Sequence, residues 1–138
     1  EREVEHILGA AILVQRTLWE EIGGMDEGYA LYFEETDWCY RARKAGWELR
    51  YIPTATIMHH GAHSTSTAPE LSSVMFARSQ ARFYRNNLGL LNYVLLKMVA
   101  FIGVVYWLMR SCFAIVRGRI SVGDFTRRLH SYWRIMLA

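Results

Sequence analysis

The sequence predicts an α/β fold that continues into helices toward its C-terminal end. Three observations support this prediction. Residues 7–14 form a nearly all-apolar run with branched side chains, which is typical of a strand buried on both faces. Helix-like and strand-like patterns then alternate, and residues 88–116 are almost continuously apolar. The 138 residues can bury one modest core, and the 52% hydrophobic content excludes a disordered chain.

The charges divide the chain into two regions. Residues 1–67 carry 11 acids and 6 Lys or Arg (net −5), whereas residues 68–138 carry 2 acids and 10 Lys or Arg (net +8). This asymmetry indicates different surroundings, the second region lying near an anionic surface. Two cysteines, Cys39 and Cys112, are too few for a disulfide framework and fit a reducing compartment. Because the chain starts at Glu1 without Met or an apolar signal core, we expect a piece of a longer protein.

Two helices are predicted in the first region. Residues 17–20 have capping-box spacing, and Gly23 and Gly24 follow as a stop, so we expect a helix of about two turns. Residues 35–45 begin with acids, end with bases and are followed by Gly46 at the position that favours a helix C-terminus. Four residues can share the inward face of this second helix: Trp38, Cys39, Ala42 and Ala45.

Two further strands and a loop are predicted next. Residues 47–51 alternate with period two and precede Pro53, which predicts a half-buried strand with Trp47 and Tyr51 in the core. Residues 55–58 predict a second short strand that ends at the histidines. Residues 62–70 are small and polar, as in a loop.

The remaining sequence predicts three helical segments. Residues 75–87 form a basic helix with Arg78, Arg82 and Arg85 on one side, either as a solvated face or as a phosphate-binding face. The apolar run 88–116 is uninterrupted only over residues 98–109, which is short for a membrane span of about 20 residues. Residues 122–137 mix basic and aromatic side chains and predict an interfacial helix. No nucleic-acid-binding motif accompanies these bases, so we expect no nucleic-acid partner.

The most specific chemical feature is a group of three acids, Glu34, Glu35 and Asp37, at the start of the second helix. A helix N-terminus favours the charged carboxylate, and a charged carboxylate in a cleft can accept a proton from a substrate hydroxyl. An acidic helix start without a catalytic role explains the same spacing. The acids lie too close together to flank a bond from both sides, as glycoside hydrolysis requires.

Six motifs occur in an order that resembles the C-terminal half of family 2 glycosyltransferases, which are bacterial inverting enzymes with a GT-A fold, and especially their rhamnosyltransferase-like members. The resemblance covers residues 7–89, with Arg82-Phe-Tyr-Arg85 followed by Asn-Asn-Leu-Gly89 as its last part. The motifs are Gly9-Ala10-x-x-Leu13-Val14-x-Arg16, Gly23-Gly24-Met-Asp-Glu27, Glu34-Glu-Thr-Asp-Trp-Cys39, Arg41-Ala-Arg-Lys-Ala-Gly46, Tyr51-x-Pro53 and His59-His-Gly61.

The resemblance implies specific site residues. Glu35 matches the general base, although the family usually has the shorter Asp there, and Asp37 matches the last acid of its E-D-x-D pattern. Gly9, Ala10, Glu34 and Asp37 are then expected to bind substrate. His59 matches a histidine that helps bind a divalent metal, Mg or Mn, on the donor diphosphate. Spacing alone favours an ordinary hydrogen-bonded histidine, because His59, His60 and His63 do not point at one ion.

The donor-side half of such enzymes, with its D-x-D motif, has no counterpart in the chain. We therefore expect three parts: residues 1–70 as a partial acceptor-side half of a GT-A domain, 71–87 as a basic amphipathic helix, and 88–138 as an apolar, membrane-associating helical tail. The metal site would be incomplete.

The resemblance implies sugar transfer from a nucleotide-sugar donor to a glycan or lipid-linked acceptor in cell wall or polysaccharide biosynthesis. The expected location is the cytoplasmic face of the cell membrane, and the apolar tail could also form a homo-oligomer. The alternative is a catalytically silent fragment, or a membrane-docking module, that lacks the donor-binding half.

Overall fold

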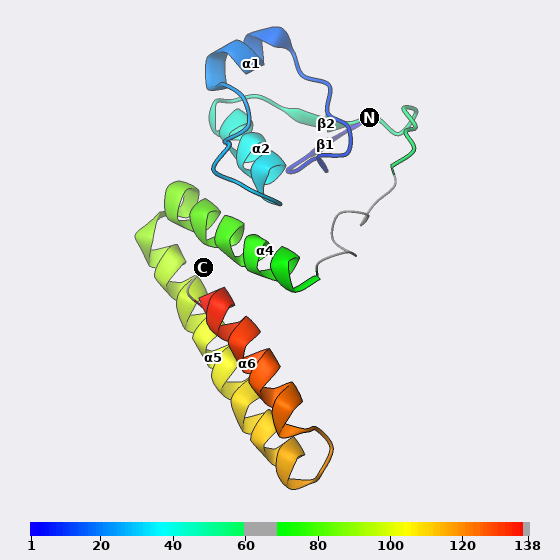
Figure 1. Ribbon diagram of the computed structural model, residues 1–138. Helices are drawn as coiled ribbons and strands as arrows, with labels where there is room; N and C mark the ends of the chain where they lie inside the picture. Colours follow the sequence, from blue (N-terminus) through cyan, green and yellow to red (C-terminus); the bar gives the residue numbers. More distant parts are fainter. Residues whose placement is uncertain (60–68, 137–138) are drawn as a thin grey trace. The chain divides into compact units, whose positions relative to one another are not determined.

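The computed structural model describes residues 1–59 and 69–136. They form two compact units, Glu1–Pro69 and Glu70–Ala138, hereafter unit 1 and unit 2. The described residues of unit 1 form two short strands and two helices, and those of unit 2 are helical (Figure 1). The protein is therefore mostly helical, with less sheet than the sequence predicts.

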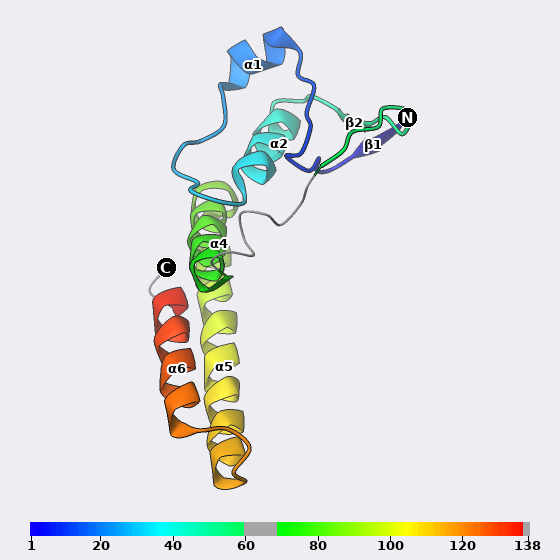
Figure 2. The same cartoon turned by 45° about the vertical axis from the view of Figure 1, so that its right-hand side comes forward.

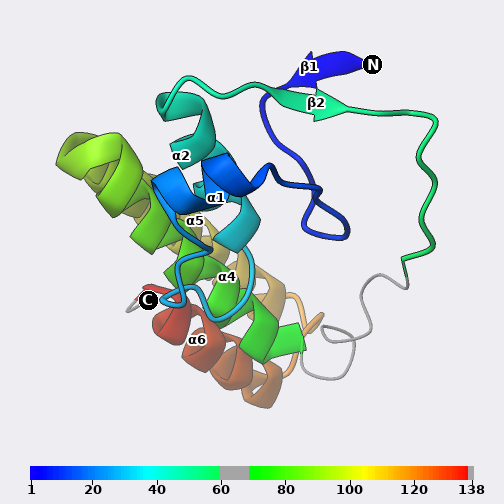
Figure 3. The ribbon, with the colours of Figure 1, turned by 90° about the horizontal axis from the view of Figure 1, so that it is seen from above.

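The sheet of unit 1 has two antiparallel strands, β1 (Arg2–Val4) and β2 (Leu49–Tyr51). Figure 3 shows them side by side. Val4 pairs with Leu49, which is buried, so the sheet contributes one apolar end to the core. The strand predicted over residues 47–51 is confirmed in a shorter form, and Trp47 packs against the core as predicted. The prediction that Tyr51 lies in the core is wrong, since Tyr51 is 51% exposed. Its partner β1 was not predicted, because charged side chains dominate residues 1–5.

Two predicted strands are wrong. Residues 7–14 and 55–58 are not strands: among the described residues, neither segment pairs with β1 or β2, and the sheet stays two-stranded. Ile12 and Val14 still pack against the core, whereas Leu8 and Leu13 are 64% and 98% exposed. Only some of the apolar side chains of residues 7–14 are thus in contact with the core, and the others are exposed.

The first predicted helix is present as α1 (Arg16–Ile22) and ends at Gly23, whose φ is 76°. Its predicted capping box is wrong: Gln15 is the N-cap and no side chain caps the helix. The first turn instead carries an ion pair between Arg16 Nε and Glu20 Oε1 at 2.7 Å. Glu20 thus pairs with the side chain of Arg16, four residues earlier, and does not complete the predicted capping box with Thr17.

The second predicted helix is α2 (Glu34–Lys44), with Ala45 as its C-cap. Gly46 follows in the left-handed region with φ 91°, as predicted, because glycine reverses the chain there without a steric penalty. Three of the four predicted inward residues are buried: Trp38, Cys39 and Ala42. Ala45 is exposed, since it lies beyond the last full turn.

The core of unit 1 forms around α2. Trp38 and Ala42 pack with Leu18 of α1 and Leu49 of β2. The indole of Trp38 donates a hydrogen bond to the Gly23 carbonyl at 3.0 Å, so its polar group is satisfied. The core thereby ties the start of the chain to α2.

Unit 2 consists of α4 (Pro69–Phe83), the π-helical turn η1 (Tyr84–Leu88), α5 (Gly89–Val116) and α6 (Val122–Met136). Helix α4 begins before the predicted residue 75, and the loop predicted over 62–70 lies largely outside the described residues. Arg78, Arg82 and Arg85 are exposed. Figures 1 and 2 both show α6 running alongside α5, and the two helices are in contact.

Helix α5 confirms the predicted apolar run as one helix. By length and composition, the helical stretch Leu71–Val116 contains a segment apolar enough to cross a membrane, and none of that segment is buried inside the protein. A single helix of this kind is compatible with a membrane anchor.

Candidate active site

The acidic cluster lies at the end of a strained loop in unit 1. Asp26 Oδ1 accepts a hydrogen bond from the Gly28 amide at 2.8 Å, which closes a turn. Tyr32 and Phe33 then adopt φ values of 63° and 70°. Bulky side chains are unfavourable in this left-handed region, at a cost of about 1–2 kcal/mol per residue. Glu34 follows directly as the first residue of α2. Strain of this kind is found at functional sites, where it fixes the direction of the next element.

Asp37 holds the start of α2 to the loops around it. Its Oδ1 accepts a hydrogen bond from the Tyr29 hydroxyl at 3.1 Å, and its Oδ2 accepts one from Arg41 Nε at 2.8 Å. Arg41 also donates to the carbonyls of Ile22 and Gly24, at 2.6 and 2.7 Å. Asp37 is 4% exposed, so this buried ion pair is fully supported by hydrogen bonds. The geometry assigns Asp37 a structural role, and substrate binding by Asp37 stays a prediction.

Glu35 lies on the same turn but is arranged differently. Its side chain is 13% exposed, and its Oε1 is 3.9 Å from His6 Nε2. The other oxygen, Oε2, is buried and has no hydrogen-bond partner among the described residues. Glu34 Oε2 has the same status. An unpartnered carboxylate oxygen is unfavourable when it is shielded from water.

Gly9 lies beside Glu35. A methyl group added at Gly9 would lie 3.5 Å from Cβ and Cγ of Glu35. That distance is ordinary contact, so packing against Glu35 does not by itself require glycine. Ala10 is half-buried. The structure thus brings Gly9 and Glu35 together, while substrate binding by Gly9, Ala10 and Glu34 stays a prediction.

His6 was missed by the sequence reading. Its Nε2 lies 3.1 Å from Thr36 Oγ1 as well as near Glu35, so the imidazole contacts the first turn of α2 through two residues. No motif surrounds His6 in the sequence. The one signal is its position directly before the apolar run 7–14, whose packing carries it to α2.

The predicted metal ligand, His59, belongs to no metal-binding cluster among the described residues. His59 is exposed, and His60 and His63 lie outside the described residues. Among residues 1–59 and 69–136, no three His, Cys, Asp or Glu side chains are grouped as a metal site would need. The described part of the chain therefore does not fit a metal ion by itself, and the assignment of His59 stays a prediction.

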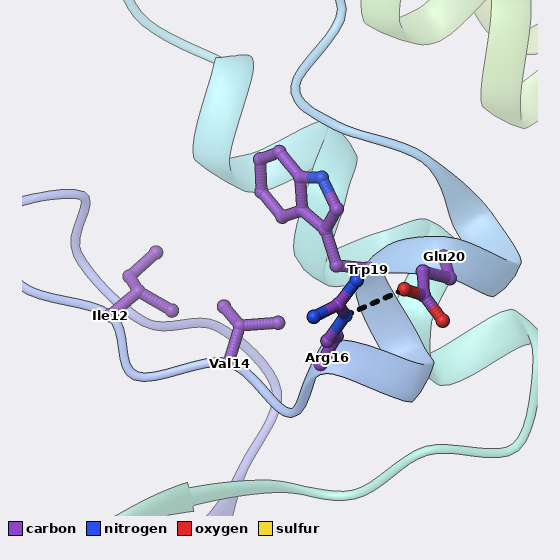
Figure 4. A pocket seen from close by; sticks show the side chains of 5 residues that line it. All are labelled: Ile12, Val14, Arg16, Trp19 and Glu20. Carbon is purple, nitrogen blue, oxygen red and sulfur yellow. Dashed lines mark hydrogen bonds and ion pairs between the residues drawn. The ribbon is translucent and has the colours of Figure 1, made fainter.

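An open pocket of about 490 Å³ lies elsewhere on unit 1. It is lined by Ile12, Val14, Arg16, Trp19 and Glu20. Figure 4 shows these side chains, with the ion pair between Arg16 and Glu20 as a dashed line. None of the predicted site residues lines the pocket, so it is not the place where Glu35 would act.

Comparison with known proteins gives partial matches to glycosyltransferases. The chain is 44% identical over 69 residues to the N-acetylglucosaminyl-diphospho-decaprenol L-rhamnosyltransferase of Mycobacterium tuberculosis, a match that covers 50% of this chain and 22% of that protein. It is 33% identical over 60 residues to the rhamnosyltransferase WbbL of Escherichia coli K12, covering 44% and 23%. It is 27% identical over 59 residues to the low-salt glycan biosynthesis hexosyltransferase Agl10 of Haloferax volcanii, covering 43% and 19%.

These matches show partial homology to rhamnosyltransferases of glycosyltransferase family 2 over about half of the chain. The chain spans only about a fifth of the length of the curated relatives it matches. No family model matches the chain, and no solved structure does. The GT-A part of the predicted fold therefore has no structural confirmation, whereas the predicted resemblance to rhamnosyltransferases is confirmed.

Proposed function

We propose that unit 1 supplies the acceptor side of a glycosyltransferase site, with Glu35 as the general base. The observation behind this proposal is that Oε2 of Glu34 and Oε2 of Glu35 are both buried without a hydrogen-bond partner among the described residues. The position of Glu35 in the Glu34-Glu-Thr-Asp motif selects it as the base. Partial homology to rhamnosyltransferases supports a sugar hydroxyl as the group that this oxygen meets. His6 Nε2 lies 3.9 Å from Oε1, so the two oxygens of the carboxylate have different surroundings.

The proposed reaction inverts the anomeric carbon. The acceptor hydroxyl transfers its proton to Glu35 as its oxygen forms a bond to the anomeric carbon, on the face opposite the leaving group. The bond from that carbon to the nucleotide diphosphate breaks, and the diphosphate leaves with the electron pair. The strained residues Tyr32 and Phe33 fix the start of α2, and the Asp37–Arg41 pair holds α2 in place, so that the base keeps one direction.

The leaving diphosphate needs charge compensation from groups outside the described cluster. A divalent metal, Mg or Mn, would neutralise it when bound, with His59 as one ligand in this proposal. Because the described residues do not assemble a metal site, no step is assigned to the metal. The donor-binding half would supply the remaining ligands.

The names of the relatives suggest the substrates. Two of them are rhamnosyltransferases, and one is named for an acceptor linked to diphospho-decaprenol. We therefore favour a nucleotide-linked deoxyhexose as donor and a glycan or lipid-linked acceptor at the cytoplasmic face of the membrane. The apolar α5 would keep unit 1 close to such an acceptor.

The test is sugar transfer by a full-length version that carries a donor-binding half. Glu35→Gln keeps the size of the side chain and removes the basic oxygen, so we expect turnover to fall on the order of 10²–10⁴-fold. Glu20→Gln is the matched control, because Glu20 is an exposed acid of the same unit and lies in another helix. Unchanged turnover in Glu35→Gln, with folding intact, would remove Glu35 from this role.

The alternative is a catalytically silent fragment or membrane-docking module. This alternative is favoured because the chain matches only a small part of its relatives, 22% of the length of the mycobacterial rhamnosyltransferase. The discriminating observation is the DNA upstream of Glu1: a reading frame that encodes a D-x-D-containing half supports the enzyme, whereas a start at that point supports the fragment. We expect no measurable transfer by the 138 residues alone. Robust transfer by this chain would contradict both that expectation and the fragment.

A further inference from the structure

Helix α5 contacts α6 along a single seam. Trp107 of α5 lies between two aromatic rings of α6, with centroid distances of 5.7 Å to Phe125 and 4.5 Å to Tyr132. Near the other end of the seam, Lys97 Nζ donates a hydrogen bond to the Met136 carbonyl at 3.3 Å. Less exposed residues recur every three or four positions on this side of α5, as in paired helices. They are Tyr93, Lys97, Ala100, Val104, Trp107, Ser111 and Ala114.

The opposite face of α5 is apolar and exposed. Ile102, at its middle, is 62% exposed, and Phe113, a further three turns along, is 56% exposed. This face continues over the length of the helix, which is too large an apolar surface to leave in water without a partner. Its residues are Leu91, Leu95, Ile102, Tyr106, Met109 and Phe113.

Helix α6 exposes polar side chains on the side that faces away from α5. Phe125, Tyr132 and Met136 are partly buried on the side toward α5, whereas His130 and Arg134 are exposed on the side away from it. Its start is capped by Ser121, whose Oγ accepts from the Asp124 amide at 3.0 Å. The two helices therefore differ on their exposed sides: α5 presents its apolar face, whereas α6 presents His130 and Arg134, with Trp133 also exposed at 63%.

We propose that the α5–α6 hairpin lies in the plane of an anionic lipid surface, with the outward face of α5 in the acyl boundary and α6 facing water. Exposed Arg110, Arg117 and Arg119 gather near the turn between the helices, where they would meet anionic headgroups. An open groove of about 320 Å³ with almost entirely apolar walls runs along α5 and is suited to acyl chains. This inference does not depend on the proposed transfer reaction.

The same contacts argue against a membrane-spanning α5. A span needs about 20 residues, and every 20-residue window of the 28-residue helix contains Lys97. Lys97 is held by the C-terminal carbonyl of α6, where the helix dipole favours a cation. If α5 crossed the bilayer with α6 attached, His130 and Arg134 would be carried into hydrocarbon, which is costly for charged side chains.

The experiment measures depth in vesicles of phosphatidylcholine with phosphatidylglycerol, using the whole protein with Cys112→Ser. A fluorescent thiol probe is placed at Leu91→Cys, Ile102→Cys or Phe113→Cys on α5, and at His130→Cys on α6. Lipids brominated at different depths then quench each probe. We expect the three α5 probes to lie at one shallow depth and the His130 position to stay accessible to a water-soluble quencher. A deepest position at 102 with a protected position 130 would overturn the proposal in favour of a span.

A pair of substitutions tests the occupant of the face. Ile102→Glu should weaken binding to the anionic vesicles roughly tenfold or more, because it places a charge where an apolar side chain would be buried. His130→Glu is the matched control, and we expect vesicle binding within about twofold of the parent protein. A chain that ignores the vesicles while forming a dimer that Ile102→Glu dissociates would show a second copy on this face instead, and would overturn the lipid proposal.

Discussion

The two units place similar side chains in opposite surroundings. In unit 1 the largest aromatic residue of the core, Trp38, is 1% exposed and its indole nitrogen is hydrogen-bonded. In unit 2 the apolar residues of α5 are exposed over most of the helix, with Val116 at 84%. Apolar residues are therefore buried in one unit of this chain and exposed in the other. In unit 1 they build a core that orients an acidic site, and in unit 2 they build a surface.

The charged groups show the same contrast. The acid Asp37 of unit 1 is buried and paired with Arg41, while the neighbouring Glu35 keeps one oxygen without a partner among the described residues. In unit 2, Lys97 is placed at the C-terminal end of α6, and Arg110, Arg117, Arg119 and Arg134 are exposed. Charged side chains of unit 1 are thus held inside the unit around the start of α2, whereas most described charges of unit 2 are at its surface.

The largest effect is expected from Trp38→Ala. Removing a fully buried indole leaves a cavity in the core of unit 1, so the free energy of unfolding should fall by about 3–5 kcal/mol. Urea denaturation followed by near-ultraviolet circular dichroism measures this loss. Trp133→Ala is the control, because that indole is 63% exposed on α6. Equal destabilisation by both variants would break the contrast between the units.

A smaller effect is expected from Asp37→Asn. The change removes the negative charge opposite Arg41 and leaves a partly buried guanidinium less well compensated, so stability should fall by about 1–3 kcal/mol. The exposed pair Arg16–Glu20 is the matched comparison, and Glu20→Gln should cost less than about 0.5 kcal/mol. Chemical denaturation of the two variants compares them directly. A loss in Glu20→Gln as large as that in Asp37→Asn would show that burial does not control these pairs.

The smallest effect concerns the two thiols. Burial raises the pKa of Cys39 above its ordinary 9.0, and the nearby Glu35 charge raises it further, whereas Cys112 is exposed. The folded protein therefore favours the protonated Cys39 thiol more than the unfolded chain does. This preference costs no stability below pH 9.0, and the free energy of unfolding falls as the pH rises from 9.0 through the higher folded-state pKa. Alkylation by iodoacetamide at pH 8, in the absence of vesicles, should modify Cys112 and spare Cys39 until the protein is denatured. Rapid alkylation of both would contradict the burial of Cys39.

The sequence predicted best what depends on neighbouring residues. The acids, the bases and Gly46 mark both ends of α2, and the apolar run predicts α5. The strand predicted over residues 7–14 failed because a strand needs a partner, and its pattern cannot say whether one is present. The resemblance of the motif order to rhamnosyltransferases was confirmed, since it rests on residue identities and not on pairing.

The unpredicted parts of the site are long-range. His6 reaches Glu35 only because residues 7–14 pack onto the core, and no local pattern encodes that contact. The left-handed conformation of Tyr32 and Phe33 is equally unpredictable, because aromatic residues rarely adopt it. In both cases the packing of α2 determines the local geometry.

The central claim is a division of labour, in which unit 1 carries the base and unit 2 binds the membrane. The most direct test measures sugar transfer and vesicle binding on the same full-length Glu35→Gln protein. We expect transfer to fall on the order of 10²–10⁴-fold while binding to anionic vesicles is unchanged. Retained transfer, or loss of both properties together in a folded protein, would contradict it.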